Sequence, residues 1–138
     1  MPWRPIAPDR GDPVTREGPI RVLLVDDELD LLLLLGIRID LEPDLRVVGK
    51  ASNGDEAVEA ALRLEPDLVV MDLLMPGTSG FEAIARLREE RPGIPIVAYS
   101  AVVTDFSKRQ VERLCVPLVL KQGNSAPLIE VIRETAGR

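Results

Sequence analysis

Polar side chains follow four apolar segments of this sequence, at the point where each segment ends. They are Asp26 and Asp27 after "IRVLLV", Asp72 at the end of "DLVVMD", Ser100 at the end of "IPIVAYS" and Lys121 at the end of "PLVLK". An aspartate in such a position is usually a turn former or a helix cap, so each residue alone is weak evidence of a site. Their repetition at successive segment ends favours a shared polar site.

The chemistry that these residues favour is phosphoryl transfer. Three carboxylates that lie together in a partly desolvated cleft repel one another, and a hard divalent cation relieves that repulsion. Oxygen-only ligands favour Mg²⁺ among such cations. A lysine and a serine add the cationic and hydroxyl donors that a transferring phosphoryl group requires.

An alternation of strands and helices along the chain must position these residues. Short apolar runs predict strands, and apolar residues at helical spacing predict the helices between them. We expect strands over residues 20–25, 45–51, 67–72, 94–100 and 117–121, and helices over 28–41, 54–64, 80–90, 104–114 and from Ser125 onward. Such an alternation favours right-handed crossovers onto a parallel sheet, whose ligands bind beyond the carboxyl ends of the strands.

The first predicted helix contains an unusually apolar run, "LLLLLGI". A membrane span needs roughly 20 predominantly apolar residues, so this run is too short to cross a bilayer. Helical spacing places Leu31, Leu35 and Ile39 on the core face and leaves at least one of Leu32 and Leu33 exposed. The exposed residue either belongs to a docking surface or lies under a covering loop.

Composition argues against several classes of function. The formal net charge of −6 and the lack of a Lys/Arg cluster argue against direct nucleic-acid binding. The chain has no histidine, which excludes histidine-dependent triads, His/Cys zinc sites and phosphohistidine chemistry. Its one cysteine, Cys115, fits a reducing compartment and is expected to be a small buried residue. With no signal peptide, we expect a cytoplasmic protein that contacts no membrane.

The chain divides into a leader and one domain. Residues 1–19 hold five of the twelve prolines and show no helical or strand period, so we expect a flexible leader. The residues over 20–136 are enough to bury the core of a single domain.

Four motifs in this order, "LLVDDE", "VVMDLLMPGTSG", "AYSA" and "VLKQ", resemble those of the receiver domain of two-component response regulators. The resemblance covers residues 20–136 and is greatest to receivers that precede helix-turn-helix output domains. It implies a flavodoxin-like, doubly wound (βα)5 sandwich with a five-stranded parallel sheet of order 2-1-3-4-5. It also implies a phosphoprotein of phosphorelay signal transduction that turns over no external substrate.

The resemblance implies a role for each strand-end residue. Asp72 would accept the phosphoryl group and form an aspartyl phosphate, Lys121 would pair with the phosphoryl oxygens, and Ser100 would hydrogen-bond the phosphoryl group. The ligands of Mg²⁺ would be Asp26, Asp27, Asp72 and the backbone carbonyl of Leu74. The donor would be a sensor histidine kinase, a phosphotransfer protein or a small phosphodonor. An output domain or a second copy of the chain would respond.

Leu118 departs from the pattern of the family, which usually has Tyr or Phe at this position. That aromatic ring normally moves with the serine, so we expect residues 104–114 to shift little on phosphorylation. Two alternative functions stay open. A degenerate receiver would be a phosphorylation-independent interaction module, but it would usually lack an acidic residue or the lysine. An enzyme acting on an external substrate through Asp72 would usually carry a second aspartate two residues later, where Leu74 stands.

Overall fold

The structure is a computed structural model that describes residues 18–75, 77 and 79–137. The leader expected over residues 1–19 therefore lies outside the described residues, apart from its last two positions. Within the described ranges, no helix is long and apolar enough to cross a membrane.

Five parallel strands form one sheet in the order β2-β1-β3-β4-β5, and a helix follows each strand. The strands are β1 (Ile20–Val25), β2 (Leu45–Ala51), β3 (Leu68–Asp72), β4 (Ile96–Ser100) and β5 (Leu118–Leu120). The helices are α1 (Leu29–Asp40), α2 (Gly54–Leu64), α3 (Gly80–Glu90), α4 (Asp105–Arg113) and α5 (Ala126–Thr135). The predicted flavodoxin-like fold and its strand order are confirmed.

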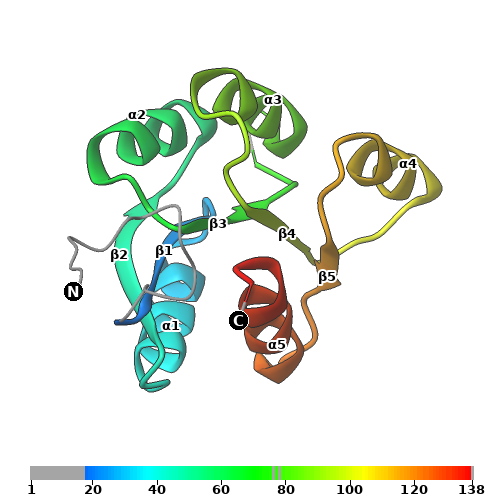
Figure 1. The fold of residues 1–138 in the computed structure, drawn as a ribbon. Coiled ribbons are helices and arrows are strands. Elements are labelled where there is room, and N and C mark those ends of the chain that lie inside the picture. Colours follow the sequence, from blue (N-terminus) through cyan, green and yellow to red (C-terminus); the bar gives the residue numbers. More distant parts are fainter. Residues whose placement is uncertain (1–17, 76, 78, 138) are drawn as a thin grey trace.

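Helices cover both faces of the sheet, and each face has its own apolar core (Figure 1). α1 and α5 lie on one face, whereas α2, α3 and α4 lie on the other. Neighbouring residues of β1 feed opposite cores. Val22 and Leu24 pack with α1 and α5, and Leu23 and Val25 pack with α2 and α3. Burial of both strand faces explains why the strands read as continuous apolar runs.

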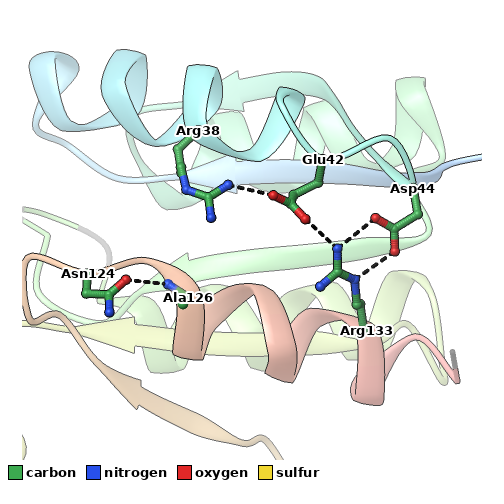
Figure 2. Close-up of polar contacts among 6 residues, drawn as sticks. All are labelled: Arg38, Glu42, Asp44, Asn124, Ala126 and Arg133. Carbon is green, nitrogen blue, oxygen red and sulfur yellow. Dashed lines mark hydrogen bonds and ion pairs between the residues drawn. The ribbon is translucent and has the colours of Figure 1, made fainter.

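Asparagine side chains cap the starts of two helices. Asn53 stands just before the predicted helix over residues 54–64, and its side chain accepts a hydrogen bond from the backbone N–H of Glu56 at 2.9 Å, as a cap of α2. α5 begins after Ser125 as predicted, but the Ser125 side chain makes no capping bond. Asn124 does so instead, because its side-chain oxygen accepts from the N–H of Ala126 at 3.0 Å (Figure 2).

The buried side of α1 differs by one residue from the predicted stripe. Its buried residues are Leu32, Leu35, Gly36 and Ile39. Leu31, expected in the core, is only half-buried. Gly36 favours this orientation, because a side chain there would lie 2.9 Å from the Cε atom of Lys50 on β2. Without one, the helix packs closely on the strand.

The opposite side of α1 exposes a group of large apolar residues, which we name the α1 outer face. Its members, each more than half exposed, are Leu29, Leu33, Leu34, Ile37 and Leu41. The prediction that Leu32 or Leu33 is exposed is thus confirmed for Leu33, and Leu32 is buried. Contiguous exposed apolar residues are uncommon on soluble monomers and are typical of interaction sites and ligand grooves.

An ion-pair network joins α5 to the turn between α1 and β2 (Figure 2). The Arg133 guanidinium of α5 contacts Asp44 through Nε at 2.7 Å and Glu42 through a terminal nitrogen at 2.6 Å. Arg38 of α1 pairs with the same Glu42 carboxylate at 2.8 Å. The hydrogen bonds to Asp44 and Glu42 raise the pKa of Arg133, despite the opposing effect of burial. The network links α5 to the end of α1 on one face of the sheet.

Two residues that were expected to be buried are exposed. Helical spacing places Leu62 on one stripe with Ala57, Val58 and Ala61, but Leu62 is 47% exposed and α2 buries Ala60 in its place. Cys115 is exposed as well, so its predicted burial is wrong. It lies past the end of α4 with a left-handed φ of 56°, where the chain turns toward β5. Its side chain therefore leaves the apolar face that Val111 and Val116 bury.

β2 forms one edge of the sheet and contains a bulge. Val47 pairs with Val22 of β1, but Gly49 pairs with the next residue, Leu23. Val48 is therefore the extra residue, and the edge strand is irregular at this point.

Candidate functional site

Three carboxylates meet at the carboxyl ends of β1 and β3. Asp26 and Asp27 follow β1, and Asp72 is the last residue of β3. Because these strands are neighbours in the sheet, oxygens of all three side chains lie within 4.8 Å of one another. Asp26 and Asp72 are each only 4% exposed, and Asp27 lies closer to the solvent. The structure thus brings the predicted metal-binding side chains together.

Lys121 enters the same site from the end of β5. Its Nζ atom lies 2.7 Å from an oxygen of Asp26 and 3.7 Å from an oxygen of Asp72. Burial disfavours the ammonium ion, but the hydrogen bond to Asp26 and the charge of Asp72 outweigh it and raise the pKa of Lys121. The lysine therefore stays protonated and offers a cation beside the Asp72 carboxylate.

The pKa of Asp72 is higher than that of an ordinary aspartate. Burial raises its pKa from 3.8 to about 6, and the charges of Asp26 and Asp27 act in the same direction. The backbone N–H of Leu74, which donates to Asp72 Oδ1 at 3.1 Å, and the charge of Lys121 oppose the shift. At neutral pH most molecules carry an ionised Asp72 that a cation would stabilise.

Ser100 ends β4, one residue after the partner of Asp72 in the sheet, and its hydroxyl bonds the loop that follows instead of a carboxylate. It is fully buried and donates a hydrogen bond to the carbonyl of Val102 at 2.9 Å. The backbone N–H of Val102 in turn donates to the same hydroxyl at 3.4 Å. Ser100 is therefore bound to the loop that leads into α4.

The turn after Asp72 depends on glycine at two positions that the sequence singles out. Gly77 has a φ of 84°, which favours glycine. Gly80 packs behind the site. An added Cβ would collide with the carbonyl oxygen of Asp72 and lie 2.6 Å from the Cα atom of Leu73. The sequence also predicts that Pro76 shapes this turn, because its ring fixes φ, but Pro76 lies outside the described residues.

A mainly apolar pocket of about 510 Å³ opens beside Ser100. It lies between the loop after β3 and α4, and its lining includes Leu74 and Val102, both more than half exposed. Phe81 and Phe106 also line it, with their rings edge to face and their centroids 6.0 Å apart. Sequence reasoning missed this pair, because the two phenylalanines lie on different helices and share no motif.

The donor set fits a hard divalent cation. Carboxylate oxygens are the ligands that Mg²⁺ prefers, and three of them converge here from two adjacent strands. The raised pKa of Asp72 reflects burial first and then repulsion by Asp26 and Asp27, and a bound cation would stabilise the ionised carboxylate against both. The ligand role of the Leu74 carbonyl stays a prediction. The bond that joins Leu74 to Asp72 is made by the Leu74 N–H.

Comparison with known proteins agrees with this geometry. A family model described as response regulator receiver domain matches residues 22–133. Protein-glutamate methylesterase/protein-glutamine glutaminase 1 of Methanosarcina acetivorans is 38% identical over 95 residues, which cover 69% of this chain and 27% of that protein. The chain spans about a quarter of the length of the first curated relatives that it matches.

Solved structures show the same similarity. The response regulator domain of Thermotoga maritima CheB has a TM-score of 0.79 at 32% identity, over 87% of this chain and 98% of that one. A two-component response regulator of the LuxR family from an Aurantimonas species has a TM-score of 0.81 at 28% identity, over 88% of each chain. Similarity thus extends to receivers of more than one kind of regulator.

Proposed function

The chain belongs to the receiver-domain family of two-component response regulators, and from this premise we propose that Asp72 accepts the phosphoryl group. The observation that carries the proposal is the position of Asp72 at a strand end, against two further carboxylates and 3.7 Å from the Lys121 ammonium. A carboxylate in this setting is a nucleophile with a cation beside it, as phosphoryl transfer requires.

In the proposed reaction an oxygen of Asp72 attacks the phosphorus of the donor. A new bond forms between that oxygen and phosphorus, the bond from phosphorus to the leaving group breaks, and the leaving group keeps its electron pair. The carboxylate must be ionised, which a pKa of about 6 allows at neutral pH. Lys121 stabilises the charge on the phosphoryl oxygens.

Asp26, Asp27, Asp72 and the backbone carbonyl of Leu74 are the proposed ligands of Mg²⁺. When bound, the ion would neutralise phosphoryl charge next to the attacking oxygen. Ser100 would exchange its bond to Val102 for one to the phosphoryl group. Because Val102 lies in the loop before α4, this exchange would alter that loop.

Phosphorylation at Asp72 can be tested by intact-protein mass spectrometry. The chain incubated with acetyl phosphate and Mg²⁺ should gain one phosphate, and chelation of Mg²⁺ should prevent this. Asp72→Asn should abolish labelling, whereas Asp55→Asn, at an exposed carboxylate that pairs with Arg86 of α3, should not. Undiminished labelling of the Asp72→Asn variant would overturn the assignment.

We propose that a sensor histidine kinase or phosphotransfer protein supplies the phosphoryl group and docks on the α1 outer face. α1 begins at Leu29, two residues after Asp27, so a partner seated there lies next to the nucleophile. The exposed leucines Leu33 and Leu34 offer that partner an apolar surface. Receiver domains of this family have partners of this class. Under this proposal the only group that reacts in this chain is Asp72. The reaction would take place in the cytoplasm.

Separate donors distinguish docking from chemistry. Leu33→Glu with Leu34→Lys should impair phosphotransfer from a protein donor and leave labelling by acetyl phosphate intact. Leu62→Glu, an exposed leucine of α2, is the matched control and should affect neither. Equal loss with both donors would contradict a docking role.

A further inference from the structure

Tyr99 is a buried aromatic residue that lies against the lysine of the site. The Lys121 Nζ atom is 5.6 Å from the centroid of the Tyr99 ring. Tyr99 is 7% exposed and packs in the core under α1 and α5. It precedes Ser100 on β4, so the two side chains point to opposite faces of the sheet. None of the roles assigned above uses Tyr99.

The sheet fixes the ring relative to the nucleophile. Tyr99 pairs with Asp72 of β3 on one side and with Val119 of β5 on the other. The ring therefore cannot shift along the strand without breaking the register that also holds Asp72. The Tyr99 ring can therefore hold the Lys121 ammonium at a fixed distance from Asp72.

Lys121 requires such support. A lysine side chain is flexible, and its ammonium has no fixed hydrogen-bond geometry. Here the Lys121 Nζ atom lies 2.7 Å from an oxygen of Asp26 but 3.7 Å from an oxygen of Asp72. Asp72 is the residue to which the phosphoryl group would be transferred. The Lys121 side chain is only 12% exposed, and a desolvated cation is attracted to the face of an aromatic ring. The ring thus adds a third contact that does not depend on the ionisation of a carboxylate.

We propose that Tyr99 is a positioning residue for phosphorylation: its ring holds the Lys121 ammonium beside the attacking oxygen of Asp72. This inference rests on the proposed function of Asp72. It assigns the effect to the ring rather than to the hydroxyl, so phenylalanine should replace tyrosine. It also predicts that Tyr99 acts through Lys121 alone.

The first test compares labelling rates by acetyl phosphate. Tyr99→Phe should be labelled at the rate of the parent chain. Tyr99→Leu and Tyr99→Met, which replace the ring by a branched and by a flexible side chain, should be labelled about three- to tenfold more slowly. Val97→Ala removes buried volume from the same core and should label at the parent rate despite its lower stability. Labelling of both ring-free variants at the parent rate would overturn the proposal, as would an equal loss in Tyr99→Phe.

The second test asks whether the effect passes through Lys121. In a Lys121→Ala background, Tyr99→Leu should cause no further loss of the remaining labelling. A further loss of the same size would overturn the proposal. In nuclear magnetic resonance spectra, the ε-methylene protons of Lys121 should show a ring-current shift that Tyr99→Phe keeps and Tyr99→Met removes.

These outcomes separate the inference from the function on which it rests. If the parent chain is labelled at Asp72 but the ring-free variants are labelled equally fast, only the role of Tyr99 fails. If the parent chain takes no phosphate at Asp72, the proposed function fails together with it.

Discussion

Replacing Asp72 by asparagine should stabilise the protein in the absence of metal, by an amount that depends on pH. Burial raises the pKa of Asp72 from 3.8 to about 6, so between these values the folded protein holds a proton that the unfolded chain releases. The stability that this proton contributes is complete below about pH 4 and is lost as the pH rises through 6. Above about pH 6 the parent chain must bury an ionised carboxylate when it folds. Asp72→Asn removes that charge and with it the cost of burying it.

The size of the effect follows from the shift in pKa. A shift of about two pH units corresponds to about 3 kcal/mol at most. That figure already includes the attraction between Lys121 and the Asp72 carboxylate, and it is an upper bound because solvent screens part of the cost of burying the charge. Asparagine keeps an oxygen that can accept from the Leu74 N–H. We therefore expect Asp72→Asn to raise the free energy of unfolding by about 2 kcal/mol near pH 8. This moves the urea midpoint by about 1 M.

Urea unfolding in the presence of a chelator measures this gain. It should be largest at about pH 8, about half as large near pH 5 and close to zero at about pH 4. Asp55→Asn, at an exposed carboxylate that pairs with Arg86, is the charge-matched control and should change stability by about 1 kcal/mol or less, by the same amount at each pH above about 5. Excess Mg²⁺ should stabilise the parent and narrow the difference. A gain that is independent of pH, or a loss at pH 8, would refute the explanation by burial.

Three other changes test the geometry of the site and its support. Gly80→Ala should destabilise the fold and slow labelling, because the new Cβ would collide with the carbonyl of Asp72. Parent-like urea midpoints and labelling rates would contradict this. Arg133→Gln should lower the urea midpoint, and the loss should shrink in about 1 M NaCl because salt screens partly exposed ion pairs. Leu74→Asn with Val102→Glu should shorten the lifetime of the aspartyl phosphate, since two exposed apolar side chains that hinder water are replaced. An unchanged decay rate after donor removal would show that water access is not limiting.

The carboxylate site could be predicted because it depends on local patterns and one rule of topology. Each of Asp26, Asp27, Asp72 and Lys121 ends an apolar strand, and parallel strands place their carboxyl ends at one edge of the sheet. No side-chain conformation had to be known. The orientation of Ser100 was beyond this reasoning, because a hydroxyl can bond either the site or its own loop, and here it bonds Val102.

Contacts between distant side chains could not be predicted in the same way. The position of the Tyr99 ring against Lys121 depends on the register of neighbouring strands and on a lysine rotamer. The side of α1 that faces the sheet was also beyond prediction, although Gly36 lies on that side and packs near the Lys50 side chain. In a helix with apolar residues on every side, helical periodicity alone leaves the buried face ambiguous.

The irregular edge of the sheet at Val48 has a consequence for association in concentrated solution. A bulge disturbs the row of free backbone groups on which a strand from another molecule would add, and the exposed charges of Arg46 and Lys50 flank it. At the opposite edge, β5 offers only the three residues Leu118–Leu120. Neither edge of the sheet therefore favours the addition of a strand from another molecule. Self-association of the native protein should proceed through helix surfaces, and fibrous β-aggregates should form only after the fold has opened.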